Sequence, residues 1–126
     1  MPLVRIDLPA GKPAEYRRLV ADVVYVAMIE ALGVPKDDRF QVIAEHTETN
    51  LIVDPTYLSI RRSKEAIVIQ VTLNEGRTVE VKKAFYKSVA DALHARAQLR
   101  REDVVISLVE VKKENWSFGN GEAQYA

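Results

Sequence analysis

Cysteine is absent from the 126 residues, which excludes a disulfide framework, a thiolate metal site and a cysteine nucleophile. An excess of charge is absent too, because 18 Lys and Arg balance 18 Asp and Glu. Without surplus positive charge, attraction to phosphate backbones or anionic lipid is weak, so we expect neither nucleic acid nor membrane partners. A chain without cysteine fits a reducing compartment, and we expect a cytoplasmic location.

Long apolar runs are missing as well. The amino-terminal region has no basic segment followed by an apolar one, so no signal peptide is predicted. The longest apolar stretch, around Val23 to Ile29, is bracketed by Asp22 and Glu30 and is too short to cross a bilayer. The chain length suits a single domain, residues 1–126, with its own hydrophobic core.

Metal-ligating patterns are scarce. His46 and His94 are the only histidines, and neither has metal-ligand spacing or lies beside a serine nucleophile motif. We therefore expect structural roles for both histidines, and no metal or cofactor.

Hydrophobic periodicity is what the chain does contain, and the same pattern occurs twice, displaced by about 64 to 65 residues. Each copy, at about 2–45 and about 66–111, reads as strand, helix, strand. Right-handed crossovers then predict an α/β (α+β) fold, in which duplicated β-α-β units form a four-stranded sheet with two helices on one face. No third helix is available for the other face, so self-association is predicted.

In the first copy, the pattern predicts a strand over Leu3 to Leu8, with alternate apolar residues on one face. Gly11-Lys12-Pro13 breaks the strand, and Gly33 and Pro35 end the helix that follows. A short strand is expected over Phe40 to Glu45. The helix buries a stripe of apolar residues at steps of three and four: Tyr16, Leu19, Val20, Val23, Val24, Ala27 and Leu32.

In the second copy, Ala66 to Leu73 is almost continuously apolar, which predicts a central strand. Thr78 is a plausible N-cap for the second helix, and Val104 to Val111 reads as the last strand. Two segments lie outside the repeat. One is the insertion 46–65, with a hairpin expected around Leu51 to Ile60, and the other is the tail 112–126; insertions on a rigid scaffold often line sites.

Pro2 gives the most specific chemical signal. Methionine is normally trimmed before a small second residue, which would leave a free secondary amine on Pro2. An ordinary α-amino group has a pKa of about 7.7 to 8.0, lowered by a nearby arginine and raised by a nearby carboxylate, so neighbours decide whether it acts as base or acid. While Met1 is attached, the Pro2 nitrogen is a tertiary amide and cannot do this chemistry. From the dipeptide alone, a merely permissive second residue is the commoner explanation.

The sequence resembles the tautomerase superfamily, and within it the malonate semialdehyde decarboxylase group, from Pro2 to about Gln124. The shared segments are Pro2-Leu3, Val34-Pro35, Asp38-Arg39-Phe40-Gln41-Val42, Glu45-His46, Arg77-Thr78, Phe85-Tyr86 and Trp116-Ser117-Phe118-Gly119. The resemblance implies a homotrimer of tautomerase-like subunits whose sheets face the centre, which would also cover the second sheet face.

The same resemblance implies roles for individual residues. Pro2 would be the acid, base or electrostatic catalyst, and Asp38 its polar neighbour. Arg77 would hold a substrate carboxylate, a task that suits the planar guanidinium fork. Trp116 and Phe118 would form an apolar wall that excludes water and strengthens charge interactions in the pocket.

Each role has a plainer alternative. By chemistry alone, Asp37 is as good a candidate as Asp38, and either could simply tighten a turn. Arg77 could be a solvated surface arginine, and Trp116 and Phe118 could be ordinary core residues. The chain also departs from the decarboxylase group, which carries an Arg-x-Arg arrangement where this sequence reads Asn74-Glu75-Gly76-Arg77 and keeps only the second arginine.

Two reactions on a small oxo acid fit these residues. Keto-enol tautomerisation needs a neutral Pro2 amine that takes a proton from carbon. Malonate semialdehyde-type decarboxylation needs a cationic Pro2 that polarises the carbonyl. Loss of one arginine and gain of Glu75 should raise the pKa of Pro2 and favour the cation, although they weaken substrate anchoring. A non-catalytic trimeric binding or signalling protein on the same scaffold is the alternative.

Overall fold

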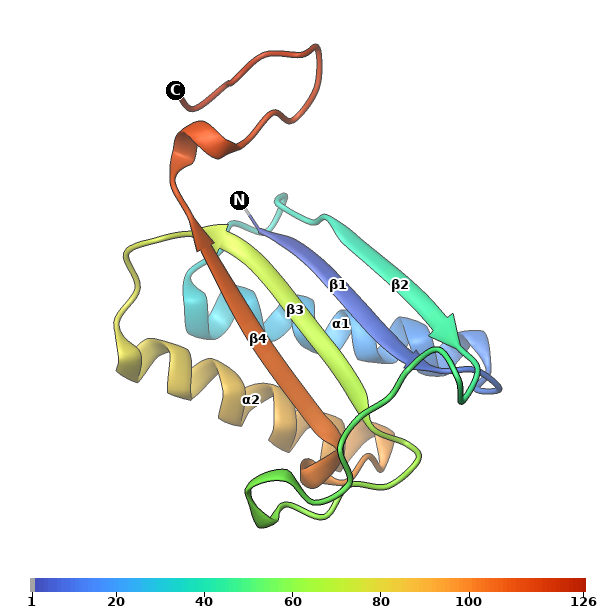
Figure 1. Ribbon diagram of the computed structural model, residues 1–126. Helices are drawn as coiled ribbons and strands as arrows, with labels where there is room; N and C mark the ends of the chain where they lie inside the picture. The colour runs from blue at the N-terminus through green and yellow to red at the C-terminus, as the bar shows by residue number, and fades with distance from the viewer. Residues whose placement is uncertain (1) are drawn as a thin grey trace.

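The computed structural model describes residues 2–126, which form one mixed sheet backed by two helices (Figure 1). The strands are ordered β2-β1-β3-β4, and both helices lie on one face of the sheet (Figure 1). β1 and β3 are antiparallel at the centre, and each pairs with a parallel outer strand, β2 and β4 respectively. The predicted pair of strand-helix-strand units is therefore confirmed. The elements are β1 (Leu3–Pro9), α1 (Ala14–Leu32), β2 (Gln41–His46), β3 (Ile67–Asn74), α2 (Val79–Ala97) and β4 (Val104–Val111).

The core lies between the sheet and the helices. Because side chains alternate along a strand, Val4, Ile6 and Leu8 of β1 all point to the helix side, and each is at most 1% exposed. β3 lies beside β1 at the centre of the sheet, as its sequence predicted, and it also buries alternate side chains. Phe85 of α2 is the largest of the fully buried side chains in residues 2–126.

The predicted helix boundaries are confirmed by their caps. Gly33 ends α1 with a φ of 70°, a left-handed conformation that glycine adopts without steric cost. Thr78 precedes α2, and its Oγ1 accepts a hydrogen bond of 3.2 Å from the Val81 backbone N–H. Neither helix, nor any other in residues 2–126, is both long and apolar enough to cross a membrane.

The sheet face away from the helices, for which no third helix is available, is mixed in character and not apolar throughout. Leu3, Val42 and Val109 leave 38%, 44% and 37% of their surfaces exposed there. The strand registers set a polar row beside them, formed by Arg5, Gln70 and Ser107. This face therefore combines exposed apolar side chains with polar ones.

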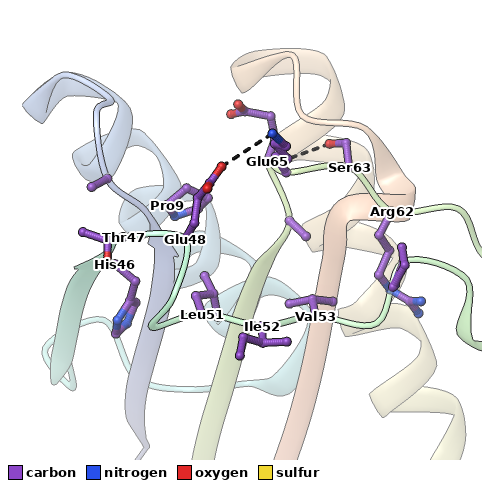
Figure 2. A pocket seen from close by; sticks show the side chains of 14 residues that line it. Pro9, His46, Thr47, Glu48, Leu51, Ile52, Val53, Arg62, Ser63 and Glu65 are labelled. Carbon is purple, nitrogen blue, oxygen red and sulfur yellow. Dashed lines mark hydrogen bonds and ion pairs between the residues drawn. The ribbon is translucent and has the colours of Figure 1, made fainter.

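The hairpin expected at 51–60 is wrong. The segment contains only a single 3-10 turn, Tyr57–Ser59, because its backbone carbonyls converge on Arg62 instead of pairing as strands. Arg62 Nη1 donates to the carbonyl oxygens of Asp54, Tyr57 and Ile60 at 3.2 to 3.3 Å. The insertion then crosses the open face at the end of the sheet where β1 and β2 finish (Figures 1 and 2).

Candidate functional site

The predicted site residues gather at one end of the sheet, where β1 begins and β3 and β4 end. Both ends of the chain lie at this end (Figure 1). The Val4 backbone N–H donates to the Phe40 carbonyl oxygen at 2.9 Å. The start of β1 is thus hydrogen-bonded to the residue that directly precedes β2. Val4 pairs with Gln41 in the parallel register of β1 and β2. Continued two residues back, this register sets buried Pro2 opposite Arg39, which follows Asp38 in the chain. The expected removal of Met1 concerns a residue outside the described range.

Asp38 is buried, whereas its neighbour Asp37 is exposed, so the structure distinguishes two residues that chemistry alone did not. Asp38 is only 3% exposed, and both of its carboxylate oxygens lie inside the protein. Burial raises the pKa of Asp38, because a charged carboxylate is poorly solvated there, and the positive amino terminus acts in the opposite direction. The β1–β2 register therefore sets this buried carboxylate next to the start of β1, where Pro2 lies.

Arg77 is half-buried and held in place, rather than being a freely solvated surface residue. Its Nε donates to the Leu32 carbonyl oxygen at 2.9 Å, which satisfies an acceptor at the end of α1. Its Nη1 donates to the Asn74 carbonyl oxygen at 3.2 Å. Within residues 2–126, Nη2 makes no hydrogen bond. The guanidinium is thus oriented by the fold with donors to spare for an anion.

Trp116 and Phe118 lie in the tail and are half-buried, so the ordinary core role considered for them is wrong. Their rings stack with centroids 5.1 Å apart, and the Trp116 indole N–H donates to Asn74 Oδ1 at 2.7 Å. Phe118 also packs against Phe40 at 5.8 Å and Tyr125 at 5.5 Å. These four rings form an aromatic cluster beside the start of β1.

Three residues of this region were not assigned any role from the sequence. Phe40 was read only as a strand residue, although it directly precedes β2 and contacts the tail. Asn74 was noted only as a departure from an arginine motif, yet a polar residue ending an apolar central strand is a usable signal. Nothing in the sequence pointed to Tyr125.

An open cavity lies at the opposite end of the sheet, away from every predicted site residue. It is an open groove of about 980 Å³ between the insertion and the ends of the strands, and Figure 2 shows Leu51, Ile52 and Val53 along it. The charged side chains along it have partners: Lys64 pairs with Glu48 at 3.5 Å, Glu65 pairs with Lys12 at 2.8 Å, and Arg62 bonds the loop carbonyls. None of the predicted site residues lines this groove.

Comparison with known proteins gives the family of the chain. Two family models described as "Tautomerase enzyme" match residues 38–119 and residues 2–61. A Bacillus subtilis (strain 168) protein named "Probable tautomerase YusQ" is 42% identical over 98% of both chains. The chain belongs to the tautomerase family.

This tautomerase-family chain is also similar to solved structures. The FG41 malonate semialdehyde decarboxylase, crystallised with 3-bromopropiolate as inhibitor, is 36% identical with a TM-score of 0.90, covering 98% of this chain and 93% of that one. A fused 4-OT described as a symmetric trimer is 21% identical with a TM-score of 0.78, covering 95% of this chain and 94% of its own, and shares the fold. The tautomerase-like fold predicted from the sequence is thus confirmed.

Proposed function

We propose that this tautomerase-family protein is an enzyme that uses the Pro2 amine, exposed by removal of Met1, for acid/base chemistry on a small oxo acid. Asp38 sets the protonation state of Pro2, and Arg77 binds the substrate carboxylate. Trp116 and Phe118 form the apolar wall. No metal or cofactor is needed for these roles.

The observation that carries the proposal is the buried carboxylate of Asp38 at the start of β1, where Pro2 lies. A negative charge within about 4 to 6 Å of an amine stabilises its protonated form, and the effect is stronger where water is excluded. Asp38 therefore favours a cationic Pro2. Glu75 adds negative charge to the loop between β3 and α2 that carries Arg77, although its side chain is exposed. The electrostatics favour a reaction that needs a positive charge over one that needs a neutral base.

Decarboxylation of a β-oxo acid such as malonate semialdehyde uses such a charge directly. The bond between the α-carbon and the carboxyl carbon breaks, carbon dioxide leaves, and the electron pair moves towards the carbonyl oxygen. The Pro2 ammonium stabilises the negative charge that develops on that oxygen. Protonation of the α-carbon then completes the aldehyde. Arg77 orients the substrate carboxylate before the bond breaks. It therefore accelerates the reaction by holding the substrate in position and takes no part in the bond changes.

Keto-enol tautomerisation is the second candidate, favoured by the name of the 42% identical relative. It requires the neutral Pro2 amine, which exchanges a proton with the carbon beside the carbonyl. With the Pro2 pKa raised by Asp38, this form is a minor fraction at neutral pH. Tautomerisation is therefore expected to be the slower of the two activities and to increase as the pH rises.

One experiment separates the two reactions from a binding function. The Pro2 nitrogen is titrated by NMR, while carbon dioxide release from malonate semialdehyde and ketonisation of an aryl-pyruvate enol are assayed on the same preparation. We expect a Pro2 pKa above the ordinary value of about 7.7 to 8.0, with carbon dioxide release the faster reaction. A depressed pKa with faster ketonisation would instead select the tautomerase. No turnover of either compound, with an ordinary pKa, would favour the non-catalytic binding protein.

The proposed assembly is a homotrimer whose open sheet faces meet at the centre. The exposed Leu3, Val42 and Val109 on that face would then be buried, and each buried apolar side chain contributes about 1.5 to 3 kcal/mol. The fused 4-OT of the same fold is described as a trimer, which supports the proposal. This assembly would bring neighbouring chains close to the Pro2 end of the sheet.

A charge on the open face should dissociate the trimer. Val109→Glu places a carboxylate where three copies meet, and burying an unpaired charge costs more than the apolar contact supplies. We expect light scattering to give three times the chain mass of 14.2 kDa for the parent protein and a lower mass for the variant. Val79→Glu is the matched control, because Val79 is 59% exposed at the start of α2 on the helix side. Equal masses for both variants would contradict the proposed interface.

A further inference from the structure

Asn74, the last residue of β3, joins two parts of the candidate site through different atoms. Its side-chain Oδ1 accepts the Trp116 indole N–H at 2.7 Å, from a residue 42 positions further along the chain. Its backbone oxygen accepts from Arg77 Nη1 at 3.2 Å. The side chain therefore contacts the aromatic wall, whereas the backbone contacts the proposed carboxylate anchor.

The tail 112–126 has little else to hold it. It extends beyond the end of the sheet, away from the helices (Figure 1). Its other hydrogen bonds are internal, such as those between Gln124 and the backbone of Phe118 and Gly119. Within residues 2–126, the Trp116 to Asn74 bond is the one hydrogen bond or ion pair that links this tail to the rest of the molecule. The ring contact of Phe118 with Phe40 adds an apolar contact without a comparable directional constraint.

We propose that Asn74 is a positioning residue that tethers the tail across the Pro2 end of the sheet. Its amide oxygen fixes the Trp116 ring, and the Trp116 ring in turn holds the stacked ring of Phe118. The kinetic part of this inference rests on the proposed enzymatic function. The tether itself is a structural property that can be tested without any turnover.

The two contacts of Asn74 predict different kinetic effects for different substitutions. Asn74→Leu removes the amide acceptor with little change in size but keeps the backbone oxygen, so Arg77 stays in place. Loosening the wall admits water and weakens charge interactions at Pro2, and kcat should fall roughly three- to tenfold with little change in KM. Arg77→Lys loses the guanidinium fork instead, and its main effect should be a higher KM.

Fluorescence tests the tether directly, because Trp116 is the only tryptophan in the chain. In Asn74→Leu we expect the emission maximum to move to longer wavelength and acrylamide quenching to increase. Asn74→Asp keeps an acceptor for the indole N–H and should restore the parent spectrum. Asn50→Leu is the control, since Asn50 is exposed in the insertion at the other end of the sheet. Unchanged quenching in Asn74→Leu would overturn the proposal.

A double-variant cycle tests whether Asn74 acts through Trp116. Trp116→Phe keeps an aromatic ring but removes the indole N–H, so Asn74→Leu should cost little further kcat in that background. Losses that simply multiply would show that the Asn74 side chain acts by another route and would contradict the tether. If the parent protein turns over neither substrate, the proposed function fails, whereas the fluorescence comparison still decides the role of Asn74.

Discussion

Replacing Pro2 with alanine should lower kcat/KM by roughly 10²- to 10⁴-fold, the usual contribution of a positioned general acid or base. Alanine is small enough for Met1 still to be trimmed, so the variant keeps an amine but loses the pyrrolidine ring. That ring prevents rotation about the N–Cα bond and so fixes the direction of the nitrogen's lone pair or N–H bonds. Steady-state kinetics with the better of the two substrates measures the loss, and intact mass shows that both proteins lack Met1. A kcat/KM within about twofold of the parent would refute a catalytic Pro2.

Retention of Met1 provides a stricter comparison, because it changes the nitrogen and leaves every side chain intact. The Pro2 nitrogen becomes a tertiary amide that can neither accept nor carry a proton. Protein made while methionine aminopeptidase is inhibited should therefore be inactive. Treatment of the same sample with that peptidase should restore activity in step with the loss of Met1 by mass. Activity that does not depend on this cleavage would show that another group performs the chemistry.

The repeat, the helix caps and the strand positions could be predicted because each depends on local spacing. Thr78 and Gly33 act on residues within one helical turn, so their effect is visible in a short window of sequence. The contact of Asn74 with Trp116 spans 42 positions and depends on where the tail passes after β4. No periodicity reports such a contact, which is why this part of the site had to come from the structure.

Two other differences show what sequence patterns leave out. Residues 51–60 had the composition of a hairpin, but the Arg62 guanidinium binds the carbonyls that strand pairing would have used. Asp37 and Asp38 have the same chemistry and differ only in burial, which is decided by the turn after Pro35. Resemblance to the tautomerase family favoured Asp38 by position, and the fold supplies the physical reason for that preference.

Asp38→Asn should slow decarboxylation while raising stability at neutral pH, because the buried charge supports the proposed cationic Pro2 but is itself costly to bury. Burial raises the pKa of Asp38 above its ordinary value of 3.8, so the folded state binds this proton more tightly than the unfolded state. The stabilisation that protonation provides is complete below the ordinary pKa and is lost as the pH rises through the raised one. Asparagine stays neutral throughout, so its urea midpoint should exceed that of the parent at pH 7, and the difference should vanish in acid.

Decarboxylation by Asp38→Asn should be slower, although the variant is more stable. Without the carboxylate, the Pro2 pKa falls, and a fall of 1 to 3 units reduces the cationic fraction at higher pH by roughly 10- to 1000-fold. The pH profile of decarboxylation should therefore shift to lower pH, while ketonisation gains from the larger neutral fraction. Asp37→Asn is the matched control, since that exposed neighbour should leave both the profile and the urea midpoint unchanged. If Asp38→Asn lost stability together with activity, Asp38 would be a structural residue, and the electrostatic argument for a cationic Pro2 would fail.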